Sequence, residues 1–191
     1  MEKEVKYLEP MVVNPPKPMV AIIGGAKVSS KIAVLESLLR NASALVVGGG
    51  MAYTFLKAQG HAIGTSLVED DQLDTAKKIL EAARKAGAEI VLPVDHLCAD
   101  RFDAAAAAKP VDSVDIPEGL MGMDVGPKTL AKYKAVLAGA KSIVWNGPVG
   151  VFEFDAFAKG TGEVAKLVAE ATGRGAVTVV GGGDSVAAVN K

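Results

Sequence analysis

Short apolar runs alternate with amphipathic segments along most of this 191-residue chain. The runs are rich in Val and Ile and four to six residues long, as is typical of buried strands. They occupy residues 20–23, 44–47, 89–94, 142–145 and 177–180. The segments between them repeat apolar residues three and four positions apart, as on one face of a helix. This alternation predicts an α/β fold: a three-layer α/β/α, Rossmann-like domain in which helices cover both faces of a parallel sheet with about five visible strands.

Glycine and proline mark the ends of the predicted helices. The helical patterns cover residues 32–42, 51–59, 73–86, 127–137 and 153–172, and a further one begins near residue 184. Gly60 and Gly87 follow the second and third patterns, where a left-handed backbone favours glycine, and Gly173 ends the fifth. Pro127 lies in a first helical turn, which tolerates proline. Residues 95–117 fit neither pattern, so we expect a long loop there, with one helical turn at 104–108.

The stretch at residues 20–30 ends an apolar run at a glycine pair and supplies Lys27 before the next helix. Glycine has no Cβ, so a ligand can approach the main chain, and the first N–H groups of a helix attract anions. The runs at 45–50, 143–147 and 178–185 also end in glycine. Such strand ends meet at one edge of a parallel sheet, where ligands bind. Glycines that only form tight turns are the alternative, but the neighbouring Lys27, Lys31 and Asp184 favour a phosphate site.

Composition and charge exclude several classes of function. The chain has 21 Lys and Arg against 22 Asp and Glu, a net charge of −1 and no basic block, so we expect no nucleic-acid partner. Cys98 is the sole cysteine, and with two His it cannot form a disulfide within the chain or a tetrahedral zinc site. The longest uncharged apolar segment, residues 41–56, is too short to span a membrane, and the charged start is no signal peptide. These features predict a cytoplasmic protein without a membrane partner.

Prolines at residues 14–18 indicate a boundary, because the sequence NPPKP excludes helix and favours an extended chain. We therefore expect residues 1–18 to form a short helix and an extended lead-in. Residues 19–191 are expected to form a single domain, which is long enough to bury an apolar core without disulfides.

Two common nucleotide-binding signatures are absent from the sequence. No segment matches the phosphate-binding loop G-x-x-x-x-G-K-[ST]. The first strand is followed by GGAK rather than by G-x-G-x-x-[G/A], and glycines stand at 48–50 where a dinucleotide-binding fold has an acidic residue. A nicotinamide-dependent dehydrogenase is therefore disfavoured.

Six motifs together resemble the phosphoglycerate kinase family, in the order and spacing of that family. They are GGAKVSSKI at 24–32, VGGGMAYTFLKAQG at 47–60, LPVDHLCADRF at 92–102, MGMDVGPKT at 121–129, VWNGPVGVFEF at 144–154 and VGGGDSVAAV at 180–189. The resemblance covers only the C-terminal, nucleotide-binding domain of that family.

This resemblance implies a role for each matching residue. Lys31 would hold the outer phosphates of ATP, and Lys27 would act on the phosphoryl group in transfer, where fixed positive charge stabilises the transition state. Asp184 would be the ligand of Mg²⁺, and Glu153 would bind the ribose hydroxyls. The remaining implied contacts are to the phosphates for Asn146, Gly182, Gly183 and Ser185, and to adenosine for Gly25, Gly49, Gly50, Phe102, Gly122, Met123, Pro148 and Val151.

Each of these residues also has a purely structural interpretation. Lys31 and Glu153 could be solvated helix residues, Asp184 a plain N-cap, and Phe102 and Met123 ordinary core residues. His61, His96 and Cys98 are expected to have no functional role. Ser30 stands where many family members have Asp, which predicts a weaker environment for the lysine or the magnesium ion.

The resemblance also implies missing parts. The N-terminal domain, which binds 3-phosphoglycerate, has no counterpart here, and neither does the final strand of the sheet. Residues 1–18 would then include the interdomain helix, and we expect self-association through the edge left by the missing strand. The expected function is the ATP- and ADP-binding half of the kinase that interconverts 1,3-bisphosphoglycerate and 3-phosphoglycerate, inactive by itself. A binding module that keeps the fold without chemistry is the alternative.

Overall fold

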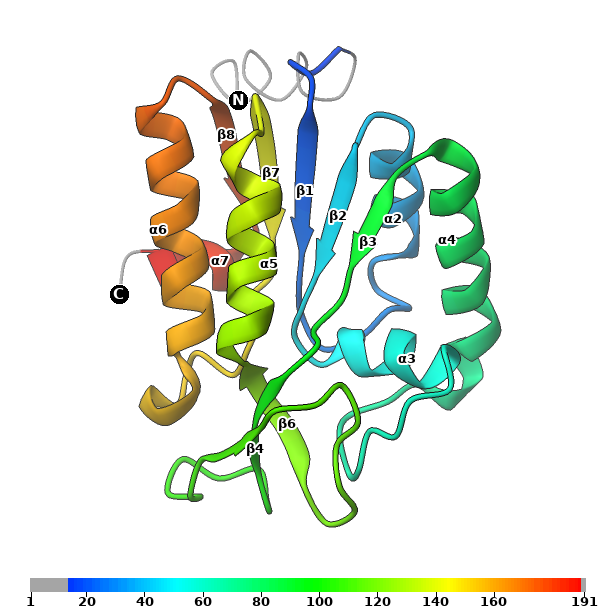
Figure 1. Ribbon diagram of the computed structural model, residues 1–191, viewed down its shortest axis with the longest axis vertical. Coiled ribbons are helices and arrows are strands. Elements are labelled where there is room, and N and C mark those ends of the chain that lie inside the picture. The colour runs from blue at the N-terminus through cyan, green and yellow to red at the C-terminus, as the bar shows by residue number, and fades with distance from the viewer. Residues whose placement is uncertain (1–13, 190–191) are drawn as a thin grey trace.

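The computed structural model describes residues 14–189 and contains a five-stranded parallel sheet (Figure 1). The strand order is β3-β2-β1-β7-β8. The strands are β1 (Met19–Ile23), β2 (Ala44–Val47), β3 (Glu89–Val91), β7 (Ser142–Asn146) and β8 (Val177–Gly181). Each pairs in parallel with its neighbours. The five predicted strands and the predicted fold class are confirmed, although β3 ends three residues before the end of its apolar run.

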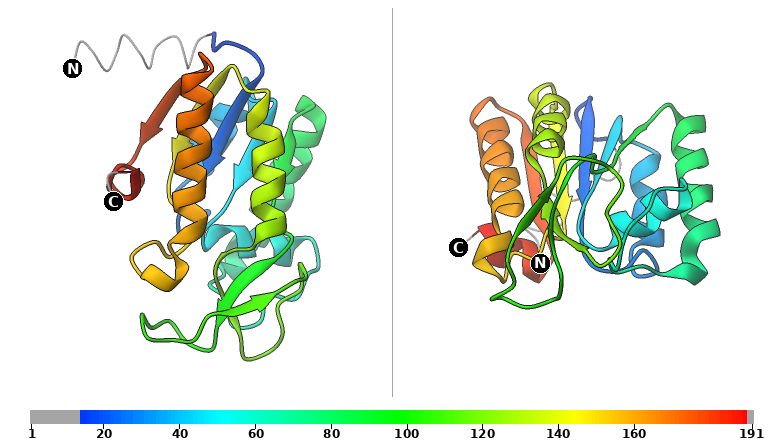
Figure 2. Two further views of the ribbon diagram at one scale, coloured as in Figure 1. Left: turned by 60° about the vertical axis from the view of Figure 1, so that its left-hand side comes forward. Right: turned by 60° about the horizontal axis from the view of Figure 1, so that its bottom comes forward.

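Helices cover both faces of this sheet (Figures 1 and 2). The first face carries α2 (Ile32–Leu39), α3 (Met51–Ala58) and α4 (Leu73–Ala86), and the second carries α5 (Pro127–Ala138) and α6 (Lys159–Gly173). The remaining helical elements are α7 (Gly183–Val189), which follows β8, and the 3-10 turns η1 (Asp70–Gln72) and η2 (Asp155–Phe157). Successive side chains of a strand point to opposite faces, so β1 places Ala21 and Ile23 in one core and Val20 and Ile22 in the other.

The helix ends follow the glycine and proline signals, with one exception. Gly87 ends α4 with a left-handed φ of 72°, and Pro127 is the first residue of α5. The exception is α6, which was predicted to start at Glu153 but begins at Lys159. The 3-10 turn η2 comes before the helix, and the Phe157 side chain within it is fully buried. Glu153 therefore lies in a turn and not in a helix.

A second, antiparallel sheet takes two of its strands from the region 95–117 that the sequence predicted as a loop, and its third strand follows that region. Its order is β5-β4-β6, formed by β4 (His96–Ala99), β5 (Lys109–Val111) and β6 (Met121–Val125). Figure 1 shows β4 and β6 beyond the carboxyl ends of the large sheet. The loop prediction was wrong because these strands are short, and β4 carries an irregularity between Leu97 and Cys98 that interrupts the alternating pattern. Residues 104–106 form a turn and bend, so the helical turn predicted at 104–108 is also wrong.

Asp95 connects this small sheet to the large domain, because its carboxylate holds the start of α5. The carboxylate accepts hydrogen bonds from the backbone N–H groups of Lys128 and Thr129, at 2.8 Å each. The Thr129 hydroxyl donates to the same carboxylate at 2.6 Å. A carboxylate at a helix N-terminus satisfies N–H groups that have no partner inside the helix. The beginning of β4 is thereby fixed against α5.

Of the predicted lead-in, only residues 14–18 are described, and the expected helix before them lies outside the described residues. The Ser142 hydroxyl donates to the Pro16 carbonyl at 2.6 Å, which joins the lead-in to β7. The boundary at residue 18 stays a prediction. Among the described residues β8 lies at an edge of the sheet and Val177 is exposed, but self-association through this edge is also untested. No helix within residues 14–189 is long and apolar enough to cross a membrane.

Candidate functional site

The glycine-rich turns at the carboxyl ends of β1, β2 and β7 are joined by main-chain hydrogen bonds. The Gly25 N–H donates to the Pro148 carbonyl at 3.1 Å, the Gly49 N–H to the Val149 carbonyl at 2.9 Å, and the Met51 N–H to the Gly25 carbonyl at 3.0 Å. Glycine lets these turns approach one another so closely. A Cβ on Gly49, whose φ is +69°, would lie 2.6 Å from the Gly25 carbonyl oxygen. The three turns therefore form one interlocked edge.

Gly24 has a different role from the one that its sequence position indicated. The sequence pattern predicted that a ligand could approach the backbone at both Gly24 and Gly25. In the structure a Cβ on Gly24 would overlap the Pro148 carbonyl, so Gly24 serves the contact between turns. Gly25, with a φ of +117°, has open space around it, and its nearest neighbour is the Lys31 side chain. Only Gly25 of this pair lines the cavity beside this edge.

The charged residues Lys27, Lys31 and Asp184 come from two turns, the one after β1 and the one after β8. Lys31 is half-buried, and its ammonium group donates to the Asn146 side-chain oxygen at 2.5 Å, which links the start of α2 to the end of β7. Asp184 is exposed in the first turn of α7. Lys27 is exposed in the turn after β1, where its carbonyl accepts a hydrogen bond from the Ser30 hydroxyl at 2.8 Å. The Ser30 hydroxyl thus stabilises the turn that carries Lys27.

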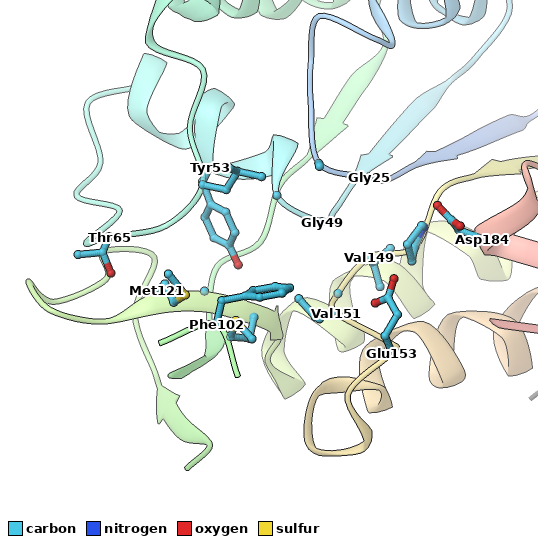
Figure 3. Close-up of a pocket in the computed structure, with 17 residues that line it drawn as sticks. Gly25, Gly49, Tyr53, Thr65, Phe102, Met121, Val149, Val151, Glu153 and Asp184 are labelled. Atoms are coloured by element: carbon cyan, nitrogen blue, oxygen red, sulfur yellow. The ribbon is translucent and has the colours of Figure 1, made fainter. Parts of the chain in front are cut away.

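A cavity of about 530 Å³ extends from this edge toward the small sheet (Figure 3). Asp184 and Glu153 lie at one end, Tyr53 and Thr65 at the other, and Phe102 projects between them. Most of the remaining lining is apolar or glycine. The lining residues are Gly25, Ala26, Gly49, Gly50, Tyr53, Thr65, Leu67, Phe102, Met121, Gly122, Met123, Pro148, Val149, Gly150, Val151, Glu153 and Asp184.

The apolar part of the cavity is bounded by groups with different exposure. Phe102 is 64% exposed and its ring contacts Phe154, with 5.0 Å between ring centroids. Met123 on β6 is 2% exposed and forms the floor. The Val151 N–H donates to the Met123 carbonyl at 2.8 Å, which fixes the wall after β7 against the floor. A flat ring inserted between these groups would bury apolar surface on both of its faces.

Asp124 lies beneath this floor and was not singled out from the sequence. Its carboxyl group is buried and accepts the N–H groups of Val125 at 2.9 Å and Gly160 at 2.7 Å. Gly150 and Gly160 leave room for it, because a Cβ on either residue would overlap the carboxyl oxygen. Burial raises the pKa of Asp124 to about 7, against the opposing effect of these hydrogen bonds and of Lys159. This carboxyl group joins β6, the cavity wall and the start of α6.

Comparisons with known proteins place the whole chain in one family. The family model described as phosphoglycerate kinase matches residues 1–191. The chain is 66% identical to the phosphoglycerate kinase of Treponema pallidum strain Nichols and 55% identical to that of Borrelia hermsii, in both cases over its full length. It spans 46% and 48% of these relatives, which is about half of their length.

Solved structures give the same result. The phosphoglycerate kinase structure from Coxiella burnetii matches 99% of this chain and 48% of its own with a TM-score of 0.94 and 46% identity. The structure from Pyrococcus horikoshii OT3 matches 100% of this chain and 48% of its own with a TM-score of 0.82 and 31% identity. The chain belongs to the phosphoglycerate kinase family.

The cavity contains most of the residues that the resemblance to phosphoglycerate kinase implied. Those that line it are Gly25, Gly49, Gly50, Phe102, Gly122, Met123, Pro148, Val151, Glu153 and Asp184. Six others lie outside the lining: Lys27, Lys31, Asn146, Gly182, Gly183 and Ser185. Of these, Lys31 and Asn146 contact each other, and the Ser185 hydroxyl accepts the Gly147 N–H at 2.6 Å. Gly182, with a φ of +88°, packs against Asn146.

The sequence analysis missed seven lining residues. They are Ala26, Tyr53, Thr65, Leu67, Met121, Val149 and Gly150. Four of them, Ala26, Met121, Val149 and Gly150, directly adjoin predicted residues, so the positions next to predicted residues were a usable signal. Tyr53, Thr65 and Leu67 come from α3 and the segment after it, and no local pattern indicated that they approach the glycine-lined edge.

For several predicted residues, the structure bears on whether the side chain has only a structural role. Phe102 is too exposed to be a core residue, whereas Met123 is both buried and part of the cavity. Lys31 is not simply solvated, because it bonds to Asn146. His61, His96 and Cys98 do not line the cavity, and burial raises the pKa of the Cys98 thiol to about 11. This thiol is therefore unreactive at neutral pH.

Proposed function

We propose that this chain binds ADP and ATP together with Mg²⁺ and forms the nucleotide-binding half of a phosphoglycerate kinase. The observation that carries this proposal is the continuous cavity, because it joins an apolar slot beside Phe102 to a glycine-lined, charged edge. A nucleotide has the same division, with a flat base at one end and phosphates at the other. Membership of the phosphoglycerate kinase family supports the assignment.

Within this proposal the nucleotide lies along the cavity. The base occupies the slot between Phe102, Met123 and Val151, and the carboxylate of Glu153 accepts hydrogen bonds from the ribose hydroxyls. The phosphates lie at the glycine-lined edge, where Lys31 neutralises their charge and Asn146 holds Lys31 in place. Lys27, which is exposed in the turn after β1 and lies near Glu69, stabilises the phosphoryl group during transfer and is the proposed catalytic residue.

Asp184 fits a magnesium site that is shared with the nucleotide. No group of three or more His, Cys, Asp or Glu side chains within residues 14–189 could hold a metal ion by itself. Mg²⁺ is commonly held by one or two carboxylates, with phosphate oxygens and waters as the other ligands. Asp184 lines the cavity at its phosphate end, which suits this arrangement. The bound ion would neutralise phosphate charge.

The complete reaction needs an acceptor site as well. We propose that the chain supplies the nucleotide side of the glycolytic interconversion of 1,3-bisphosphoglycerate and 3-phosphoglycerate in the cytoplasm, and that a further domain binds the acceptor. A module that keeps the fold without chemistry is the competing function. The two functions differ in one measurable property, because a module without chemistry is not expected to bind ADP more tightly when magnesium is present.

Isothermal titration calorimetry with ADP, with and without Mg²⁺, tests this function. We expect magnesium to increase the affinity of the wild-type chain, and we expect Asp184→Asn to remove most of that increase, since a neutral amide is a poor ligand for a hard cation. Titration in EDTA provides the matched baseline for both proteins. Equal affinities of the two proteins in magnesium would contradict the assignment of Asp184, and absence of ADP binding would contradict the proposed function.

A further inference from the structure

Tyr53 places a polar group in the part of the cavity opposite Asp184 (Figure 3). Figure 3 shows its ring descending from α3 with the hydroxyl pointing into the cavity, toward Phe102 and Met121. Leu67, Met121 and Gly122 surround this end of the cavity, and Thr65 is the other lining residue there with a polar side chain. The hydroxyl therefore lies in a largely apolar part of the site.

The position of the Tyr53 hydroxyl is fixed by its neighbours. The side chain is only 5% exposed, and its ring packs against His96 with 5.7 Å between ring centroids. Gly122 makes room for the hydroxyl, since a Cβ at that position would overlap it. The Gly122 N–H in turn donates to the Ser66 hydroxyl at 2.9 Å, which holds the strand in this place. A group held in this way binds a ligand atom without a further loss of side-chain freedom.

The two buried tyrosines of the cores differ in their hydrogen bonds. The Tyr133 hydroxyl donates to the Val47 carbonyl at 3.0 Å. The Tyr53 hydroxyl has no hydrogen bond to another residue in the described part of the chain. Burial raises the pKa of Tyr53 far above its ordinary value, so the hydroxyl stays protonated and can both donate and accept. The hydroxyl is not one of the fully buried unpaired polar atoms of the described residues, so it is reached from the cavity and can pair there with water or a ligand atom.

We propose that the Tyr53 hydroxyl hydrogen-bonds the outer edge of the nucleobase and that Tyr53 is thereby a specificity-determining residue of this site. The inference rests on the proposed function, because the phosphates at the glycine-lined edge direct the base toward Tyr53. A hydroxyl donates to a ring nitrogen that lacks hydrogen, as in adenine, and accepts from an N–H, as in guanine. Tyr53 therefore favours purines with a polar edge over flat bases without one, and it distinguishes adenine from guanine only weakly.

The test compares Tyr53→Phe with the wild-type chain, using ADP and benzimidazole riboside 5′-diphosphate. The second ligand keeps the shape and the phosphates but has no hydrogen-bonding groups on the six-membered ring. We expect Tyr53→Phe to weaken ADP binding about 3- to 10-fold, the effect of one hydrogen bond, and to leave the benzimidazole ligand unchanged. GDP should lose as much affinity as ADP. Tyr133→Phe is the matched control, because it removes the other buried hydroxyl and should not alter the ratio of the two affinities.

The outcomes separate this inference from the proposed function. ADP binding with an unchanged ratio in Tyr53→Phe overturns the role of Tyr53 and leaves the nucleotide site intact. Equal weakening of both ligands also overturns it, because the effect then comes from packing. Wild-type protein that binds neither ligand contradicts the proposed function itself. If Tyr53→Phe does not fold, the wild-type chain still decides, because the inference requires it to prefer ADP over the benzimidazole ligand by a similar factor.

Discussion

The two ends of the cavity are built in different ways. At the Asp184 end, main-chain atoms of neighbouring turns form the surface, and hydrogen bonds between backbone groups such as Gly49 N–H and the Val149 carbonyl hold it together. At the Tyr53 end, side chains from α3 and β6 and from the loop that carries Phe102 form the surface. One end depends on the absence of side chains and the other on their packing.

This difference explains why the two ends should respond differently to substitution. A side chain added at Gly24 or Gly49 displaces a neighbouring turn and alters several contacts together. At the other end a single side chain can be shortened while its neighbours keep their places, so the loss is local. Activity, stability and binding measurements can each test this contrast, and the largest effect is expected in activity.

That largest effect concerns the acceptor, which the proposed function places on a further domain. None of the cavity-lining residues in the described part of the chain is Lys or Arg. We expect this chain to turn over ATP and 3-phosphoglycerate at least about five decades more slowly than a full-length family member, because lost positioning of the acceptor raises the barrier by roughly 7 kcal/mol. A coupled assay with ATP, Mg²⁺ and 3-phosphoglycerate measures this rate.

Adding a separately expressed N-terminal domain of a phosphoglycerate kinase to that assay gives the control. Activity that appears only after this addition would locate the acceptor site outside this chain. Turnover close to that of an intact kinase without the addition would contradict the prediction.

The second effect distinguishes backbone strain from contact between turns. Gly49 and Gly87 have nearly the same positive φ, +69° and +72°, but only Gly49 has atoms within 4 Å of an added Cβ. We expect Gly87→Ala to lower the free energy of unfolding by about 1–2 kcal/mol, the cost of the left-handed backbone. Gly49→Ala should cost about 1–3 kcal/mol more and abolish ADP binding, because the turns must separate. Urea titration and calorimetry measure both; equal destabilisation would refute the contact argument.

Sequence analysis was accurate where the signals are local. Gly49 and Gly50 were placed at the glycine-lined edge because glycine after a strand end has a direct conformational meaning, and the same reasoning placed Gly87 at the end of α4. Pro148 was named only through the family resemblance. The roles of Glu153 and Asp184 came from the family resemblance, since a single carboxylate in a turn has no distinctive pattern.

The small sheet and the Tyr53 end could not be predicted in this way. β4, β5 and β6 have three to five residues each, and their pairing joins segments of irregular pattern. Tyr53 and Gly122 are far apart in the sequence, and the fit of one against the other depends on how α3 sits over β6. Asp124 likewise resembles any strand residue until its burial and its two N–H donors are known.

The third effect is a pH dependence of stability from Asp124. Its pKa is about 7 in the folded chain against an ordinary value of 3.8, so the folded chain binds the proton more tightly than the unfolded chain does. The stabilisation is therefore complete below about pH 4 and is lost as pH rises through 7. Between pH 5 and pH 8 we expect the free energy of unfolding of the wild type to fall by about 2–3 kcal/mol relative to that of Asp124→Asn.

Urea denaturation of both proteins across this pH range measures the difference. Comparing how the free energy of unfolding changes with pH in the two proteins cancels the contribution of groups that titrate in both. One such group is His96, whose pKa is lowered by burial. Asp124→Asn is less stable at every pH, since the amide cannot accept both N–H groups, but its slope should be flatter. Parallel slopes for the two proteins would show that the carboxyl group is ionised throughout.

The smallest effect compares the two ends directly through paired ligands. Lys31→Ala should weaken ADP binding about tenfold and leave adenosine unaffected, because only phosphates meet the ammonium group and one charged hydrogen bond contributes about 1.5 kcal/mol or more. Phe102→Ala should weaken both ligands by the same factor, about fivefold or more, since stacking on an aromatic ring contributes roughly 1 kcal/mol or more whatever follows the ribose. Lys85→Ala, on the far helix α4 and paired with Glu81, is the control for loss of positive charge.

The ratio of the ADP and adenosine affinities is the decisive quantity, because instability or misfolding changes both affinities together and leaves their ratio constant. A constant ratio in Lys31→Ala would mean that Lys31 only supports Asn146 and the turn after β7, and the division of the cavity into a phosphate end and a base end would then rest on Asp184 alone.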